Sequence, residues 1–198
     1  MAELHFFDFD GTLFRSPSPP AVWKGGWWGS VDSLTPPCVP AKPGADWWIN
    51  STVSAAKKSI GNPDVYAVMM TGRDNRPDMR YRIADLLKMK GLNFDAVFLS
   101  TSGDSIGDKK KMVAKLLNRY PSIDTVKFWD DRPSHLPALA SAAEKSGIDP
   151  DLIHTQLVRE RSKDPLCEEG EIELADPETL ARSIKKCRYV AVFLDASS

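Results

Sequence analysis

The stretch LHFFDFDGTLF, residues 4–14, places two carboxylates inside a run of aliphatic and aromatic residues. Residues 4–8 have the continuous apolar character of a strand that is buried on both faces, and Gly11 then permits a tight turn. Asp8 and Asp10 are two positions apart, so they point to the same side if the extended geometry persists. A buried charge without a partner is unfavourable. The pair therefore indicates a site at the strand end that holds a cation or a shared proton.

Beyond this stretch, apolar runs alternate with amphipathic segments along the chain. Pro77 and Gly91 are typical start and stop signals of a helix, and Asp46 and Gly61 are the expected N-cap and stop of another. The alternation predicts an α/β fold, with a mostly parallel central sheet covered by helices on both faces. The predicted strands are residues 4–8, 64–72, 95–100, 124–131, 151–158 and 189–195 (the last a strand or a docked tail), and the predicted helices are residues 47–60, 76–91, 108–120, 133–147 and 177–187.

Residues 15–46, RSPSPPAVWKGGWWGSVDSLTPPCVPAKPGAD, interrupt this alternation. The segment is too long and too rich in proline for a simple loop, but its aromatic residues argue against disorder. We expect one domain over residues 1–198, with residues 15–46 as an ordered flap or small cap. A small cap leaves the site open, which favours a macromolecular phosphate over a small metabolite.

Composition excludes several classes of protein. The chain has 198 residues, of which 42% are hydrophobic, and its net charge is −1. That value excludes a strongly basic nucleic-acid coat, although a local basic groove is compatible with it. Cys38, Cys167 and Cys187 form no CxxC pair, so we expect reduced thiols in a cytoplasmic protein (or a nuclear one, in a eukaryote). The N-terminus resembles no secretory signal, and no apolar run reaches membrane-spanning length, so neither secretion nor a membrane partner is expected. The oligomeric state is open.

Polar residues with a common chemistry follow three of the predicted strands. Asp8, Thr71 and the pair Asp130–Asp131 all fall at strand carboxyl ends, where open α/β sheets form their sites. Mg²⁺ is commonly bound by one or two carboxylates together with a substrate phosphate. A carboxylate at a strand end can also attack phosphorus. The alternative is that the acids of DFDGT merely cap a turn.

In their order along the chain, DFDGTLF, TGR, KKKM and WDDR resemble the motifs of the haloacid dehalogenase (HAD) superfamily. The resemblance implies a three-layer, Rossmann-like HAD fold and a Mg²⁺-dependent phosphohydrolase. It implies that Asp8 is the nucleophile and that Asp10 is the general acid and base. The other implied roles are phosphoryl binding by Thr71 and Lys111 (Lys109 being the second candidate), and Mg²⁺ binding by Asp8, Asp10 and Asp131, with Asp130 as a secondary ligand.

A second resemblance concerns TLFRSP, GGWW, the later WW and the DR-x-x-H pattern, which are similar to the HAD domain of Swiss Army knife RNA-repair proteins. It implies removal of a terminal phosphate from RNA or DNA ends or from a nucleotide. Two interpretations of the tryptophans stay open: a platform on which bases stack, or a small core that fixes the insert. His135 is either a substrate contact or an ordinary helix residue. The candidate substrate-binding residues are Gly11, Thr12, Gly72, Arg73, Arg132, His135, Trp23, Trp27 and Trp28.

Other functions remain as alternatives. The chain is then either a small-metabolite HAD phosphatase or a catalytically idle HAD scaffold that binds a partner through the tryptophan-rich insert. A phospho-receiver is disfavoured because residues 99–103, after the third strand, contain no aspartate. A dinucleotide-binding enzyme is disfavoured because no G-x-G-x-x-G follows the first strand.

Overall fold

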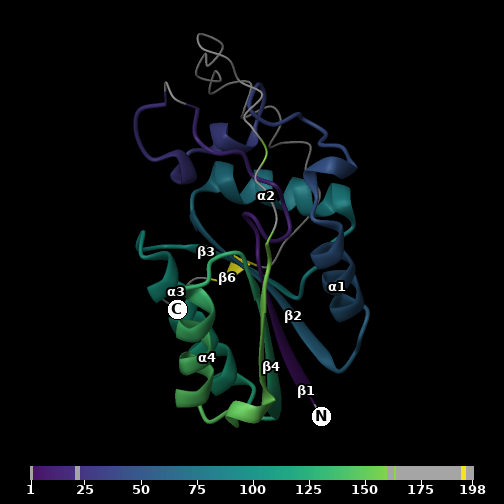
Figure 1. The fold of residues 1–198 in the computed structure, drawn as a ribbon, viewed down its shortest axis with the longest axis vertical. Helices are drawn as coiled ribbons and strands as arrows, with labels where there is room; N and C mark the ends of the chain where they lie inside the picture. Colours follow the sequence, from purple (N-terminus) through teal and green to yellow (C-terminus); the bar gives the residue numbers. More distant parts are fainter. Residues whose placement is uncertain (1, 21–22, 160–162, 164–192, 195–198) are drawn as a thin grey trace.

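The protein is built on one twisted parallel sheet (Figure 1). The computed structural model describes residues 2–20, 23–159, 163 and 193–194. Among these residues the strand order is β5-β4-β1-β2-β3-β6, and every pairing is parallel. The α/β fold predicted from the sequence is confirmed. The strands are β1 (Ala2–Asp8), β2 (Val65–Asp74), β3 (Ala96–Ser100), β4 (Ile123–Asp130), β5 (Ile153–Leu157) and β6 (Phe193–Leu194).

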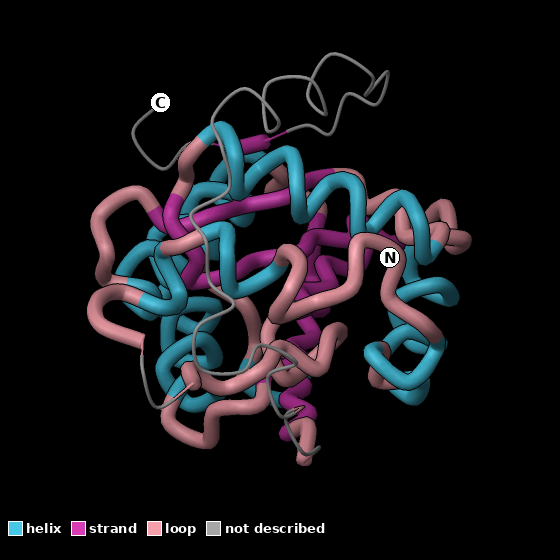
Figure 2. Tube along the Cα trace, turned by 90° about the horizontal axis from the view of Figure 1, so that it is seen from above, coloured by secondary structure: helices cyan, strands magenta, loops and turns pink. Residues whose placement is uncertain are grey.

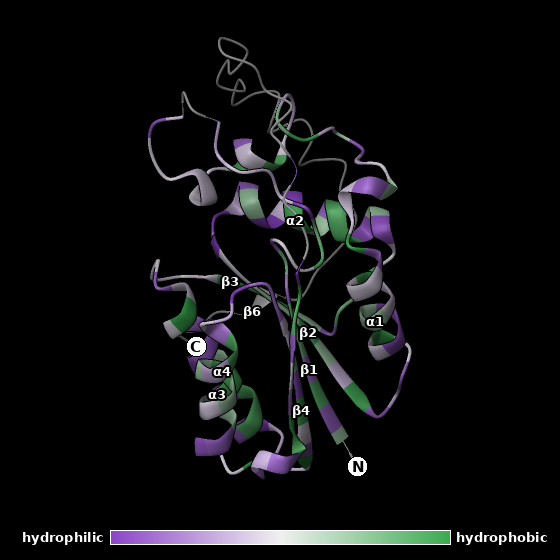
Figure 3. Ribbon diagram, viewed as in Figure 1, coloured by the Kyte–Doolittle hydropathy of each residue, from purple (hydrophilic) through white to green (hydrophobic). Residues whose placement is uncertain are grey.

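Helices cover both faces of the sheet, which gives three layers (Figures 1 and 2). α1 (Asn50–Ile60) and α2 (Pro77–Lys90) share one apolar core with Phe7 of β1. α3 (Ser105–Arg119) and α4 (His135–Lys145) share the opposite core with Phe6. Adjacent residues of β1 thus enter different cores, because successive side chains of a strand point to opposite faces. Apolar residues accordingly concentrate along the strands and on the inner sides of the helices (Figure 3).

The helix boundaries show where local sequence signals suffice. α2 begins at Pro77 and ends before Gly91, whose φ of 70° is left-handed, as the sequence predicts. Gly61 follows α1 as expected. The N-cap of α1 is Ile49, however, so the predicted cap at Asp46 is wrong: that residue lies in a separate 3₁₀ turn, η3 (Ala45–Trp47), after which the chain is extended. α3 begins three residues earlier than predicted.

The described part of the insert consists of short turns packed beside α2 (Figure 1). Its other 3₁₀ elements are η1 (Trp27–Gly29) and η2 (Val31–Leu34). Leu34 and Val39 are fully buried in the core shared with α1 and α2. Arg82 of α2 donates hydrogen bonds to the backbone carbonyls of Leu34, Pro40 and Ala41. The insert is therefore fixed both by apolar burial and by polar contacts to α2.

Some predictions fall outside or at the edge of the described residues. The predicted helix 177–187 lies outside them, as do most of the loop 159–175 and of the predicted strand 189–195, of which β6 is described. A further 3₁₀ turn, η4 (Pro150–Leu152), precedes β5.

Cys38 is disulfide-bonded, which differs from the expectation of three reduced thiols. None of the described helices has both the length and the apolar composition of a membrane span.

Candidate active site

The chain turns sharply after β1, and this turn meets the acid that follows β4. Gly11 has a φ of 67°, a conformation that favours glycine, and its N–H donates to the carbonyl of Phe14 over 2.8 Å. A Cβ atom on Gly11 would come within 2.5 Å of the Oδ2 atom of Asp131. Glycine is thus required both by the turn and by the close approach of Asp131. This contact brings the first and last predicted motifs together.

Lys109 links β1 and β4 at their carboxyl ends. Its Nζ atom lies 2.9 Å from the Oδ1 atom of Asp8 and 2.8 Å from the Oδ2 atom of Asp130. All three side chains are almost completely buried. Burial alone would lower the pKa of Lys109, but the charges of Asp8 and Asp130 raise it above the usual value. The ammonium group is therefore charged and held between the two carboxylates.

The prediction that Lys111 is the catalytic lysine is wrong. The Lys111 side chain is 68% exposed, and its closest acidic partner is Asp108, at 3.8 Å. Lys109 lies three and seven residues before Met112 and Leu116, which are buried against the sheet, so all three share one helix face. Lys111 is rotated by about 200° from Lys109 and faces solvent. The second candidate of the sequence, Lys109, occupies the site.

Asp10 is bound by Arg73 rather than left open to a metal. The Arg73 guanidinium donates from Nε to both Asp10 oxygens, at 2.9 and 3.0 Å, and from a terminal nitrogen to Oδ1 at 2.7 Å. The hydroxyls of Ser16 and Thr71 donate to the same carboxylate. Burial alone would raise the pKa of Asp10, but the charge and hydrogen bonds of Arg73 lower it. Asp10 is therefore held in the ionised form.

This pairing corrects the prediction that Arg73 binds a substrate phosphate. Arg73 is 1% exposed, and its remaining terminal nitrogen donates to the hydroxyl of Ser33 over 2.6 Å. It also lies 3.5 Å from the carbonyl oxygen of Trp28. Ser33 and Trp28 belong to the insert, so Arg73 joins the insert to Asp10. Its principal contacts are to the protein itself.

Asp130, the last residue of β4, is held by three groups. Its Oδ2 atom contacts Lys109 and lies 3.1 Å from the Nδ1 atom of His135, and its Oδ1 atom accepts the backbone N–H of Arg132. Burial alone would raise the pKa of Asp130, but the hydrogen bond to His135 and the charge of Lys109 lower it to about 2. His135 thus positions Asp130, which differs from its predicted role as a direct substrate contact, although it also lines the cavity described below.

Three carboxylates form a group suited to a metal ion. Asp8, Asp130 and Asp131 each offer an oxygen, and these oxygens lie within 4.8 Å of one another. The Oδ1 atom of Asp131 is buried and has no hydrogen-bond partner. Oxygen donors of this kind suit a hard divalent cation such as Mg²⁺. Asp10 was also predicted as a ligand, but its carboxylate is not part of this group; Arg73 binds it instead.

Negative charge exceeds positive charge among the buried groups of the site. Lys109 and Arg73 are the buried cations of the site. They face four carboxylates, which belong to Asp8, Asp10, Asp130 and Asp131. Burial raises the pKa of Asp8 well above its usual range even though Lys109 opposes the shift. Burial, followed by the neighbouring negative charge of residue 130, also raises the pKa of Asp131. The residues therefore fit a divalent cation, whose charge would stabilise the ionised forms of Asp8 and Asp131.

The other predicted polar residues are packed into the walls of the site. The hydroxyl of Thr71 donates a hydrogen bond to Asp10 and accepts one from the backbone N–H of Arg73. Thr12 is fully buried, and its hydroxyl has no hydrogen-bond partner. A Cβ atom on Gly72 would lie 2.2 Å from the Oγ atom of Ser105, so glycine lets α3 approach β2.

The tryptophans of the insert divide into a small core and an exposed ring. Trp27 is 3% exposed, donates through Nε1 to the carbonyl of Pro17, and packs with Trp23 and Cys38. The prediction that Trp27 binds substrate is therefore wrong, and Trp23, half-buried against it, does not line the cavity over the acids. Trp28 is 38% exposed and does line that cavity. The interpretation as a small core thus holds for Trp27, while base stacking on Trp28 stays a prediction.

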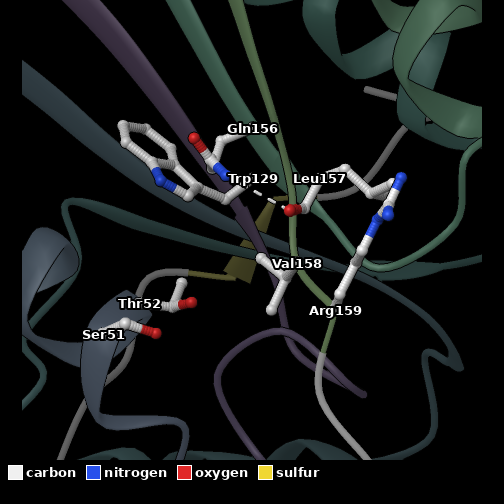
Figure 4. Close-up of a pocket in the computed structure, with 7 residues that line it drawn as sticks. All are labelled: Ser51, Thr52, Trp129, Gln156, Leu157, Val158 and Arg159. Atoms are coloured by element: carbon white, nitrogen blue, oxygen red, sulfur yellow. Dashed lines mark hydrogen bonds between the residues drawn. The ribbon is translucent and has the colours of Figure 1, made fainter.

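The acids open into a cavity of about 190 Å³ beyond the carboxyl ends of β1 and β2. Another pocket, of about 340 Å³, lies between the first turn of α1 and the ends of β4 and β5 (Figure 4). It is lined by two hydroxyls, an amide, the ring of Trp129, two aliphatic residues and Arg159, but by no carboxylate. The cavity with acid and base groups is therefore the candidate active site. It is lined by Asp8, Asp10, Trp28, Gly72, Arg73, Gly103, Ser105, Lys109, Arg132 and His135.

Sequence reasoning missed three serines that shape the site. Ser16 and Ser33 bind Asp10 and Arg73 from the insert, and Ser105 begins α3 and lines the cavity. Ser105 follows Asp104, which caps α3, so a closer assignment of that helix start would have placed it. No local pattern marks Ser16 or Ser33, because their partners are distant in the sequence.

Comparison of whole structures defines the class of fold. The HAD domain of the effector protein Lem4 from Legionella pneumophila, in its inactive-mutant form, matches with a TM-score of 0.54 and 14% identity, over 93% of this chain and 91% of that one. A second Lem4 structure gives a TM-score of 0.51 at 15% identity, over 93% and 92% of the two chains. At these identities the likeness shows the fold alone: an HAD domain.

Sequence comparison then places the chain in a particular family. Residues 16–175 match HAD domain family 1 in Swiss Army Knife RNA repair proteins, and the chain belongs to that family. The chain is also 25% identical over 169 residues to the uncharacterized protein YMR265C of Saccharomyces cerevisiae. That match covers 71% of this chain and 37% of the yeast protein, so this chain spans well under half of its relative's length. Both resemblances inferred from the motifs are confirmed.

Proposed function

We propose that this chain is a Mg²⁺-dependent phosphohydrolase that removes a terminal phosphate from a nucleic acid or nucleotide through an aspartyl-phosphate on Asp8. One observation carries the proposal. Asp8 ends β1 at a cavity, in contact with Lys109 and within a carboxylate group whose charge the buried cations do not balance. Membership of an HAD family supports a phosphatase, and the RNA-repair proteins that define the family support a nucleic-acid substrate. Residues 15–46 would act as a flap within the same domain.

Two steps follow from the positions of the side chains. A carboxylate oxygen of Asp8 bonds to phosphorus while the bond from phosphorus to the leaving oxygen breaks, and the leaving oxygen takes a proton from solvent because Arg73 holds Asp10 in the ionised form. Water then attacks phosphorus, Asp10 takes the proton of the water, and the bond from Asp8 to phosphorus breaks to release inorganic phosphate. Arg73 stabilises the ionised Asp10 that the second step needs.

The same residues provide the electrostatics of phosphoryl transfer. Asp8, Asp130 and Asp131 would hold Mg²⁺, which when bound neutralises negative charge on the phosphoryl oxygens. Lys109 adds a fixed positive charge at the nucleophile. Arg132 lines the cavity from the turn after β4 and can meet the outer oxygens of the phosphate.

The test is phosphate release by the purified protein, with Mg²⁺ and after chelation. The substrates are oligonucleotides with a 3′-phosphate, a 5′-phosphate or a 2′,3′-cyclic end, beside nucleotides and sugar phosphates. We expect metal-dependent release from a nucleic-acid end, and label transfer from a ³²P-phosphorylated end to wild-type protein but not to Asp8→Asn. Full activity of Asp8→Asn would refute the mechanism. A strong preference for a sugar phosphate would instead show a small-metabolite phosphatase.

A further inference from the structure

A second cavity adjoins the active site beyond the carboxyl ends of β2 and β3. Its volume is about 580 Å³, and residues 74–76 and 100–103 line it. Gly103 lines both this cavity and the one over the acids, and Arg73 of the active site directly precedes Asp74 of the second cavity. A group attached to a phosphate at Asp8 therefore has an adjoining space to enter. We call this space the β2–β3 cavity.

Trp28 lines the active-site cavity, and the residue after it packs against the wall of the β2–β3 cavity. Its ring lines the active site and lies 5.4 Å from the guanidinium carbon of Arg73. The next residue, Gly29, packs against the wall of the β2–β3 cavity, since a Cβ atom there would lie 2.6 Å from the Oδ2 atom of Asp74. The backbone of Trp28 is thus seated on the end of β2.

The exposure of Trp28 sets it apart from its neighbour. Trp28 is 38% exposed, whereas Trp27 is 3% exposed. Of the described tryptophans, Trp28 is the only exposed one. Leaving an apolar ring in water forgoes the stabilisation of burial. Arg73, fixed by its bonds to Asp10 and Ser33, supports the ring. A rigid ring at the mouth of a site binds a flat aromatic group with little loss of side-chain freedom.

The β2–β3 cavity presents both hydrogen-bond donors and acceptors. No described residue makes a side-chain hydrogen bond or ion pair with the Asp74 carboxylate. Asn75 accepts through Oδ1 from Arg80 over 3.3 Å, which leaves its amide N–H groups available. The Arg76 guanidinium is 62% exposed, and its contact to Asp78 is 3.4 Å long. A ligand with an aromatic ring and a polar edge suits this wall better than an aliphatic chain does.

We propose that Trp28 and the β2–β3 cavity bind the nucleoside from which the phosphate is removed. The terminal base stacks on Trp28, and its polar edge and sugar face Asp74, Asn75 and Arg76. The inference rests on the proposed hydrolysis at Asp8, and it names the group that the site selects. Stacking on an aromatic side chain recognises the flat ring that every base has, so the subsite selects nucleotides without selecting one base.

The test compares kcat/KM for a nucleoside monophosphate and for glycerol phosphate in the full chain. In Trp28→Ala we expect the nucleotide-to-glycerol-phosphate ratio to fall by about 5- to 150-fold, the range that corresponds to losing one base stack. Trp28→Phe should restore most of the ratio. The matched control is Tyr81→Ala, which removes an exposed aromatic ring of α2 outside both cavities and should change the ratio by less than about two-fold.

The outcomes separate this inference from the proposed function. An equal loss of both activities in Trp28→Ala would overturn the inference and show that the ring only supports Arg73. A wild-type protein that hydrolyses glycerol phosphate as well as the nucleotide would also overturn it, with the proposed hydrolysis intact. If no phosphoester is hydrolysed, the proposed function fails. Calorimetric binding of an unphosphorylated dinucleotide then tests the inference separately. Binding that is weakened in Trp28→Ala would support the inference, and absence of binding to the wild type would overturn it.

Discussion

Asp108 provides a quantitative test of how the loop before α3 is held. It is 1% exposed and accepts hydrogen bonds from the hydroxyls of Ser100 and Ser102 and from the N–H groups of Thr101 and Ser102, all between 2.7 and 2.9 Å. Burial alone would raise the pKa of Asp108, but these bonds lower it from 3.8 to about 2. Because Lys109 is the next residue, the same bonds hold the start of the helix that carries it.

The pKa shift sets the size of the expected effect. A difference of nearly two units, at about 1.4 kcal/mol per unit, means that the ionised Asp108 stabilises the folded state by about 2 kcal/mol near pH 7. Asp108→Asn keeps an amide oxygen in place of Oδ2 and removes the charge. We therefore expect the free energy of unfolding to fall by about 2 kcal/mol near pH 7.

The pH dependence has a definite sign. The pKa is lower in the folded state, so the stabilisation is fully present above the unfolded pKa near 3.8 and disappears as the pH falls through about 2. Urea unfolding followed by tryptophan fluorescence should show a constant gap between wild type and Asp108→Asn from about pH 7 to 5, and a shrinking gap below about pH 4. The exposed Asp64→Asn is the control and should show almost no gap. A gap for Asp108→Asn that does not change with pH would refute the electrostatic explanation.

Three further predictions concern the site itself. Lys109→Met should lower kcat by about 100-fold or more because a charge beside the nucleophile is lost, while Lys111→Met stays within about two-fold; equal effects on phosphate release would contradict the assignment. Gly11→Ala should lower the free energy of unfolding by more than about 1 kcal/mol, since its φ is positive and Asp131 leaves no room for a Cβ atom; unchanged denaturant unfolding would argue against that packing. Mg²⁺ should raise the melting temperature of the wild type more than that of Asp131→Asn, because an ion that binds only the folded state stabilises it; equal shifts would place the ion elsewhere.

Much of the fold could be predicted because its signals are local. The apolar run before Asp8 and the Pro77 and Gly91 signals of α2 depend only on neighbours in the sequence, and each predicts its element correctly. Parallel pairing then brings Asp8 and Asp130 to one edge without any further information. The position of the site follows from the same rule.

The side-chain partners could not be predicted, because they depend on segments that are distant in the sequence. Of the three consecutive lysines, only Lys109 shares the helix face of the buried Met112 and Leu116, but its contact with Asp8 depends on a strand that is distant in the sequence. Arg73 resembles a phosphate ligand until Asp10 and Ser33 are known to surround it. An aromatic-rich insert does not reveal which of two adjacent rings the core will bury.

The shared contacts of Arg73 connect the insert to the chemistry of the site. This buried guanidinium bonds to Asp10 on one side and to Ser33 on the other, and it supports the ring of Trp28. Removing one partner of a buried charge leaves the other partner without compensation, which is far more costly than losing an exposed ion pair. A change in the insert that displaces Ser33 thus alters the hydrogen bonding of the cation that holds Asp10 ionised. The proposed substrate selection by the insert and the proposed proton transfer by Asp10 would therefore be coupled through a single side chain, and we expect substitutions in η2 to affect both.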